Sequence, residues 1–463
     1  MGKGVYSYVL EFTRCDSPED PYAFDFGAQD YSLRTPGGGR ELLTLRWDKR
    51  FREDLMALRR DGSPSSIGQR VGDQLNQALR PAGWSAIARE IVDAIDTGAR
   101  VLLTIQSNAA ELYALPWELL TLDASGVALG ALPEVLVRYA WPETNTKRDP
   151  EPPSEMGRVL VAWSETGGPI PDVEHVESIE RACLDGHVDF DRGRDVVTHA
   201  SPRSLVAALR AGNQTEQPYA ILHLLCHGVA IGEGFGVLLD GDEDSRPVAV
   251  DAGRMRQLLA PFASRLRLVV LSACDTGNVG EAGNHLGSVA QALHRAGIAA
   301  VVASRYPLSV TGSTTLTRHL YRSLLVDLVS LEQALIDART RLVEHAQTFD
   351  WASLQLYARE RDGTDSRPLV FRPYRGLLAF DAAHSRFFFG RDREIEETLS
   401  DLEGLYATGK PRFLVIAGAS GTGKSSVVLA GVLPRLEAQG RMVAIIRPGD
   451  APMEALEAAL CRR

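Results

Sequence analysis

The fold is decided by two stretches, Tyr219–Gly228 (YAILHLLCHG) and Leu268–Gly277 (LVVLSACDTG). Each opens with a continuous apolar run of the length expected for a buried strand. Each then ends in a reactive side chain followed by a turn that contains glycine. Ligands of open parallel sheets bind at the carboxyl ends of the strands, so we expect His227 and Cys274 to lie at one edge of such a sheet.

Strand and helix patterns alternate on either side of these two stretches. Further strands are predicted at Arg158–Trp163, Val196–Thr198 and Ile298–Ala303, and a helix is predicted to begin at Ser201 and Pro202. This alternation predicts an α/β fold, in which helices flank a mainly parallel sheet.

Composition and motifs divide the 463 residues into four segments. Residues 1–142 form an N-terminal α+β region, which is either a degenerate half of the same fold or an independent domain. Residues 143–155 are rich in Pro, Thr and charge and are predicted to be a linker. Residues 156–365 hold the predicted sheet, and residues 366–463 begin a P-loop α/β domain.

A histidine beside a cysteine at a sheet edge favours nucleophilic catalysis. A free thiol has a pKa of about 8.5. We therefore expect His227 to take the proton of Cys274 and later to protonate the leaving amine. The backbone N–H groups of Gly228 and Cys274 are predicted to hold the oxyanion of the tetrahedral intermediate. The histidine precedes the cysteine by 47 residues, close to the spacing of about 50 in caspases.

A single cysteine at a strand end usually serves packing, which is the role predicted for Cys226. His223 lies further back on the same strand and is predicted to be structural. A zinc site made of His223, Cys226 and His227 is disfavoured, because one strand does not bring these three side chains together.

A second motif, Gly418–Ser425 (GASGTGKS), has the full P-loop pattern and follows the apolar stretch Phe413–Ala417, which we predict to be a strand. Such a loop binds ATP or GTP with Mg²⁺, Lys424 reaching the β- and γ-phosphates and Ser425 holding the metal. The other predicted phosphate-binding residues are Gly418, Ser420, Gly421, Thr422 and Gly423. Only 38 residues follow Ser425, so we expect the domain to be incomplete and the chain to be part of a longer protein.

Composition limits the class of partner. The formal net charge of −10 argues against broad binding to nucleic acid or to an anionic membrane. No apolar run reaches the roughly 20 residues that a transmembrane helix needs, and the N-terminus lacks the pattern of a signal peptide. The five cysteines are few and scattered, which fits a cytoplasmic protein better than a disulfide framework.

The two strand ends resemble the CHAT domain of the caspase, separase and clostripain clan of cysteine peptidases. Three further stretches carry the same resemblance: Leu115–Leu120 (LPWELL), Gly297–Ser309 (GIAAVVASRYPLS) and Trp351–Tyr357 (WASLQLY). Relatives often carry an Asp shortly after the loop that ends at Ser309, where it helps to bind a basic residue before the cleaved bond. Val310–Gly312 occupies that position here, so the cleavage preference stays open.

The last segment resembles STAND-class NTPases of the bacterial signalling type, on Pro373–Phe380 (PYRGLLAF), Phe387–Ile395 (FFFGRDREI) and Ala430–Leu436 (AGVLPRL). The two resemblances together imply a cysteine endopeptidase that cleaves a partner protein under the control of a nucleotide switch. That switch would assemble into a homo-oligomer, and the resemblance implies a role in antiphage defence or programmed cell death. The alternatives are a catalytically silent caspase-like interaction module on the same scaffold and a chain that acts mainly as an NTPase.

Overall fold

The computed structural model describes residues 5–15, 27–34, 39–58, 63–122, 126–141, 157–215, 217–231, 234–242, 246–272, 285–306, 308–344, 348–358, 368–369, 379–407, 413–446, 449 and 451–461. The chain divides into two compact units. The first comprises residues 1–185 and 190–370, and the second comprises residues 371–463 with the short stretch 186–189. Among the residues that the structure describes, no helix is both long and apolar enough to span a bilayer.

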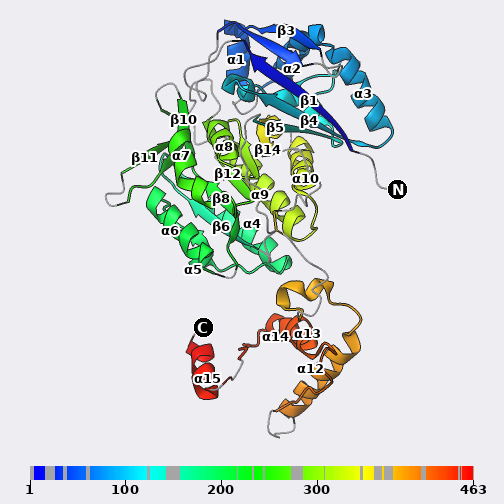
Figure 1. The fold of residues 1–463 in the computed structure, drawn as a ribbon, viewed down its shortest axis with the longest axis vertical. Coiled ribbons are helices and arrows are strands. Elements are labelled where there is room, and N and C mark those ends of the chain that lie inside the picture. Colours follow the sequence, from blue (N-terminus) through cyan, green and yellow to red (C-terminus); the bar gives the residue numbers. More distant parts are fainter. Residues whose placement is uncertain are drawn as a thin grey trace. The chain divides into compact units, whose positions relative to one another are not determined.

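The first unit is built on one sheet of eleven strands in the order β3-β2-β1-β4-β5-β14-β13-β12-β8-β6-β7 (Figure 1). Most neighbours are parallel; the antiparallel pairs are β1 with β2, β2 with β3, and β13 with β14. The predicted mainly parallel sheet is therefore confirmed. The strands are β1 Val5–Arg14, β2 Gln29–Arg34, β3 Arg40–Leu45, β4 Arg100–Ser107, β5 Val135–Ala140, β6 Arg158–Trp163, β7 Val196–Val197, β8 Tyr219–Leu225, β12 Leu268–Ser272, β13 Ala300–Ser304 and β14 Leu354–Ala358.

The N-terminal strands continue the sheet of the second segment instead of forming a sheet of their own. β5 lies beside β14 in parallel, with Tyr139 opposite Tyr357. The rings of these two residues pack against each other and against Tyr113, with centroids 5.5 to 6.1 Å apart. The junction between the two halves of the sheet is therefore a buried aromatic cluster. The division of residues 1–365 into separate domains remains a prediction.

Helices cover both faces of this sheet (Figure 1). Val270 of β12 pairs with His223 of β8, whose side chain bonds to residues of α4 and α9. On the opposite face, Tyr357 of β14 packs against His294 of α8. The helices of the first unit are α1 Lys49–Ala57, α2 Ser65–Leu79, α3 Trp84–Asp96, α4 Asp172–Asp185, α5 Arg192–Asp195, α6 Pro202–Asn213, α7 Ala252–Leu259, α8 His285–Arg295, α9 Val310–Leu325, α10 Leu331–Glu344 and α11 Asp350–Ser353.

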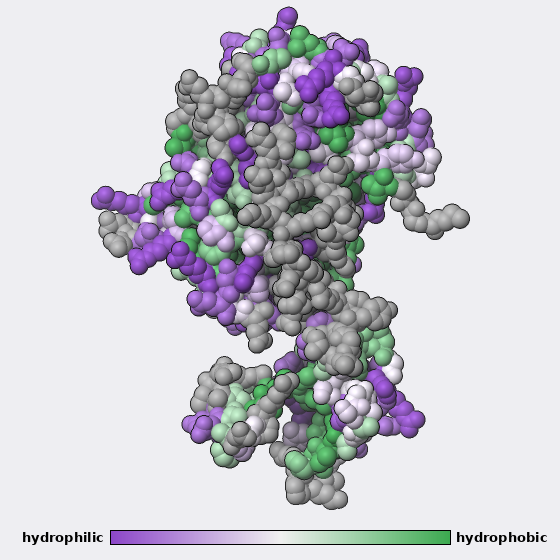
Figure 2. Space-filling model, viewed as in Figure 1, coloured by the Kyte–Doolittle hydropathy of each residue, from purple (hydrophilic) through white to green (hydrophobic). Residues whose placement is uncertain are grey.

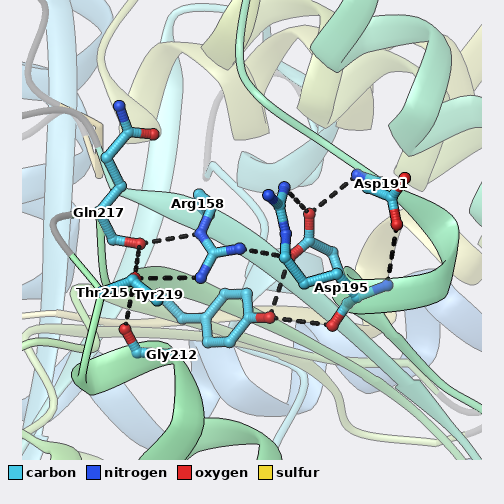
Figure 3. Close-up of polar contacts among 8 residues, drawn as sticks. Arg158, Asp191, Asp195, Gly212, Thr215, Gln217 and Tyr219 are labelled. Carbon is cyan, nitrogen blue, oxygen red and sulfur yellow. Dashed lines mark hydrogen bonds and ion pairs between the residues drawn. The ribbon is translucent and has the colours of Figure 1, made fainter. Parts of the chain in front are cut away.

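The amino ends of β6 and β8 are held together by buried polar groups (Figure 3). The Arg158 guanidinium donates to Asp195 of α5 at 2.9 Å, and the hydroxyl of Tyr219 donates to the same carboxylate at 2.9 Å. Arg158 also donates to the carbonyl of Gln217 at 2.8 Å. Because every partner is hydrogen bonded, the buried charges stabilise this end of the sheet instead of disrupting it.

A small antiparallel sheet, in the order β11-β10-β9, begins at the carboxyl edge of the large sheet. Its strands are β9 His227–Ile231, β10 Gly234–Leu239 and β11 Val248–Asp251. β9 starts two residues after β8 ends, so the chain turns out of the large sheet at His227.

The second unit contains α12 Asp392–Ala407, a helical run made of α13 Lys424–Ser426, the π-helix η7 Val427–Val432 and α14 Leu433–Ala438, and then α15 Pro452–Cys461. The strand predicted at Phe413–Ala417 is wrong for this structure: in the described part of the chain these residues pair with no other strand. A strand is stable only beside a partner, and Phe413 and Val415 are left 77% and 67% exposed. Figure 2 shows hydrophobic side chains at the surface of this unit.

Candidate active site and phosphate loop

The carboxyl ends of three parallel strands, β6, β8 and β12, are aligned at one edge of the large sheet. Leu225, the last residue of β8, lies opposite Ser272, the last residue of β12. Beyond this pair the backbone N–H of Cys226 still donates to the carbonyl of Ser272 at 3.1 Å. On the other side, the N–H of Ser164 donates to the carbonyl of Leu225 at 3.0 Å. The sheet therefore carries its register up to the point where His227 begins the next strand.

His227 is held in one orientation by a backbone carbonyl. His227 is 8% exposed, and its Nε2 lies 3.0 Å from the carbonyl oxygen of Gly168, in the loop between β6 and α4. A carbonyl oxygen only accepts, so Nε2 carries the hydrogen and Nδ1 of the neutral ring keeps its lone pair. Among the residues that the structure describes, nothing bonds to Nδ1. The contact with Gly168 therefore orients the ring and leaves Nδ1 as the nitrogen that can accept a proton.

Two glycines make this contact possible, and the sequence reasoning missed both. Gly167 and Gly168 have φ angles of +104° and +150°, in the region that disfavours residues with a side chain. A Cβ on Gly167 would lie 3.2 Å from Cβ of His227, closer than ordinary packing. The available signal was Gly-Gly-Pro in a loop directly after a predicted strand, but nothing in the sequence tied that loop to His227.

Cys274 lies outside the described residues, as do Ala273 and Asp275. In the sequence it follows Ser272 by two residues, as His227 follows Leu225. Gly228, the other predicted oxyanion donor, is the second residue of β9 and lies opposite Val237 of β10. The catalytic pair and the oxyanion donors therefore remain predictions.

His223 has a separate, structural set of partners. Its Nε2 lies 3.0 Å from Nδ1 of His175, and its Nδ1 lies 3.2 Å from the hydroxyl of Tyr321. His175 also contacts Thr317 and Ser313 of α9. Burial lowers the pKa of His175 to about 4 and lowers that of His223 well below its ordinary value. Both imidazoles are therefore neutral at physiological pH and join α4, β8 and α9.

The P-loop has the backbone that its glycines require. Gly421 and Gly423 have φ angles of +80° and +87°, and no atom lies within 4 Å of an added Cβ. Glycine is therefore required at these positions by the backbone conformation and not by a lack of room for a side chain. The Lys424 ammonium donates to the carbonyls of Gly418 and Ala419, at 2.9 and 2.7 Å. Ser425, at the start of the following helix, is exposed. A loop of left-handed glycines, a lysine over it and a free hydroxyl fit a Mg²⁺-nucleotide.

Comparison with known proteins supports both halves of this description. Residues 72–359 match the family model described as the CHAT domain, and residues 373–463 match that of Novel STAND NTPase 1. The resemblances seen in the sequence are thus confirmed. No curated protein matches the chain.

Some solved structures match part of the chain at low sequence identity. The complex of Porphyromonas gingivalis RgpB pro- and mature domains is 11% identical, with 70% of this chain and 77% of that chain covered and a TM-score of 0.38. Two structures of the Saccharomyces cerevisiae separase–securin complex are 10% identical, with a TM-score of 0.36. The match covers 76% of this chain but only 30% of the separase chain. Because the CHAT model spans well over half of the sequence, the chain belongs to the CHAT family.

Proposed function

We propose that this protein is a cysteine endopeptidase that cleaves a partner protein, with His227 and Cys274 as its catalytic pair and an attached nucleotide switch as its control. The observation that carries the proposal is the register of β8 and β12, whose last paired residues are Leu225 and Ser272. Each catalytic residue follows its member of this pair by two positions in the sequence.

The orientation of His227 suits the first chemical step. With Nε2 bound to Gly168, Nδ1 accepts the proton of the Cys274 thiol, and the thiolate attacks the carbonyl carbon of the scissile peptide bond. The backbone N–H groups of Gly228 and Cys274 are the proposed donors to the resulting oxyanion. The imidazolium then protonates the leaving amine, and water, deprotonated by the same imidazole, releases the acyl group.

The second unit provides the proposed control. Lys424 would hold the β- and γ-phosphates of ATP or GTP, and the hydroxyl of Ser425 would hold the Mg²⁺ ion that neutralises part of the phosphate charge. A CHAT domain and a STAND NTPase domain in one chain support a peptidase that stays inactive until the switch responds and assembles into a homo-oligomer. We propose that such a cytoplasmic protein acts in bacterial antiphage defence or programmed cell death.

The experiment that tests the peptidase is a comparison of protein N-termini in cells that express active protein and its Cys274→Ala variant. New N-termini that depend on Cys274 are expected, and identical patterns would exclude the peptidase. Labelling of Cys274 by a thiol reagent distinguishes the peptidase from the alternative, a catalytically silent interaction module. In a peptidase, labelling of Cys274 depends on His227; in a silent module, the His227→Ala variant is labelled at the same rate.

A further inference from the structure

Three motifs that the proposed chemistry does not use come together in the folded chain. They lie in η3 (Trp117–Leu119), in the segment 305–309 that follows β13, and in α11. Arg305 and Glu118 are separated by 187 residues in the sequence, yet their side chains are in contact. The meeting point lies at the carboxyl end of β13, next to the end of β12 that leads to Cys274.

Arg305 is the centre of this contact. Its guanidinium donates to Glu118 Oε2 at 3.1 Å, to the hydroxyl of Tyr139 at 2.7 Å and to the carbonyl of Ala352 at 2.8 Å. The Tyr139 hydroxyl donates in turn to the Glu118 carboxylate at 2.9 Å. Arg305 and Glu118 are 2% and 1% exposed, so the pair is shielded from water and its geometry is fixed.

The segment that Arg305 begins is fastened at further points to residues 349–353. The N–H of Tyr306 donates to the hydroxyl of Ser353 at 3.2 Å, and that hydroxyl donates back to the carbonyl of Tyr306 at 3.0 Å. The N–H and hydroxyl of Ser309 donate to Asp350, at 3.2 and 2.6 Å. Ser309 also caps α9. The described residues of this segment therefore have little freedom to move.

The charge of Arg305 is maintained although the residue is buried. Burial opposes the charge, but Tyr139 and Glu118 raise the pKa of Arg305 above its ordinary value. A guanidinium without its carboxylate would be a buried, unpaired charge, which the surrounding backbone could accommodate only by moving. The position of the segment is therefore coupled to the Glu118 carboxylate.

We propose that Arg305 is a positioning residue, with Glu118 as its counter-ion, which fixes the described residues Tyr306 and Ser309 beyond β13 as part of a wall of the substrate-binding site. The proposal rests on the proposed peptidase function. β12 and β13 are parallel neighbours, so their carboxyl ends share the edge at which a substrate backbone must lie. A preorganised wall beside the nucleophile places the peptide for attack without changing the thiol itself.

The fold supplies a matched control at the opposite edge. Arg158, Asp195 and Tyr219 form the same kind of buried cluster of arginine, carboxylate and tyrosine at the amino ends of β6 and β8 (Figure 3). Arg158 and Asp195 are 3% and 0% exposed. Asp195 also pairs with Arg194, so the melting temperature of each variant is measured beside its labelling rate. Only the cluster of Arg305 lies at the proposed site.

The test compares two reagents for Cys274 in the full chain. The rate at which iodoacetamide modifies Cys274 depends on the thiolate alone. The rate for a pool of peptidyl acyloxymethyl ketones with varied residues depends on the thiolate and also on binding of the peptide to the wall. Arg305→Lys and the milder Tyr139→Phe are expected to slow the peptidyl reagents about tenfold while iodoacetamide changes less than about twofold. Arg158→Lys and Tyr219→Phe should leave both rates unchanged at temperatures below all melting transitions.

The possible outcomes are distinct. A similar loss in the variants of both clusters, or no loss in Tyr139→Phe, would overturn the positioning role. Equal iodoacetamide rates in the native protein and His227→Ala would instead remove the proposed peptidase function.

Discussion

At the scale of single residues, the site depends on two glycines as much as on the histidine that they serve. Gly168 offers the carbonyl that orients His227, and Gly167 leaves room for the ring. Neither residue has catalytic chemistry of its own. Their contribution is a backbone path that a residue with Cβ follows only under strain.

Gly167→Ala is expected to lower the reactivity of Cys274. The added Cβ meets His227 at 3.2 Å, and the positive φ costs about 1–2 kcal/mol in addition. The matched control is Gly83→Ala, which has a φ of +81° but no atom within 4 Å of its Cβ. Both variants should lose thermal stability, whereas only Gly167→Ala should slow labelling by iodoacetamide at neutral pH. Equal labelling rates in the two variants would contradict this role.

At the scale of secondary-structure elements, α4, β8 and α9 are joined by the neutral pair His175 and His223. Burial lowers both pKa values, so the unfolded chain binds protons more tightly than the folded chain. Stability from this cluster is complete above about pH 6.5 and falls as the pH is lowered. The same strand, β8, leads directly to His227, so the cluster supports the edge that carries the candidate site.

The free energy of unfolding should decrease between about pH 6.5 and pH 4, by about 3 kcal/mol for the shift of His175 alone. Urea unfolding at a series of pH values measures this slope. His175→Gln should make the slope shallower, because one of the two buried imidazoles no longer titrates. His199→Asn, which changes an exposed histidine with a φ of +50°, should leave the slope unchanged. A steep slope in both variants would assign the pH dependence to other groups.

The P-loop of the second unit and the helix that follows it are expected to bind nucleotide through Lys424. Lys424→Ala should weaken binding of a fluorescent ATP analogue about 100-fold, since a charge-assisted contact to phosphate is lost. Arg441→Ala serves as the control, because Arg441 is another cation of the second unit and packs over the ring of Tyr406. Unchanged affinity in Lys424→Ala would mean that nucleotide binds elsewhere.

At the scale of the whole molecule, the first unit is one sheet to which both parts of the sequence contribute. β14 pairs with β5, and Arg305 forms an ion pair with Glu118 of η3. Residues 157–370 alone would therefore leave β14 paired only with β13 and would leave Arg305 without its carboxylate partner.

The fragment 1–370 should unfold in one cooperative transition, and the fragment 157–370 should not. Circular dichroism on heating distinguishes the two, because without β5 the ring of Tyr357 and the edge of β14 are exposed. A fragment 157–370 with a melting temperature equal to that of 1–370 would show that the N-terminal strands are dispensable for the fold.

The sequence alone determined the parallel sheet, the position of His227 at a strand end and the P-loop. These features depend on local periodicity and on short motifs, which neighbouring residues encode. Only the tertiary structure decided which backbone orients His227, which carboxylate accompanies Arg305, and that the N-terminal strands extend the same sheet. Those partners lie 59 and 187 residues away in the chain, and a contact of that separation is fixed by packing of the whole sheet. The strand predicted at Phe413–Ala417 illustrates the same rule, because an apolar run becomes a strand only when another strand lies beside it.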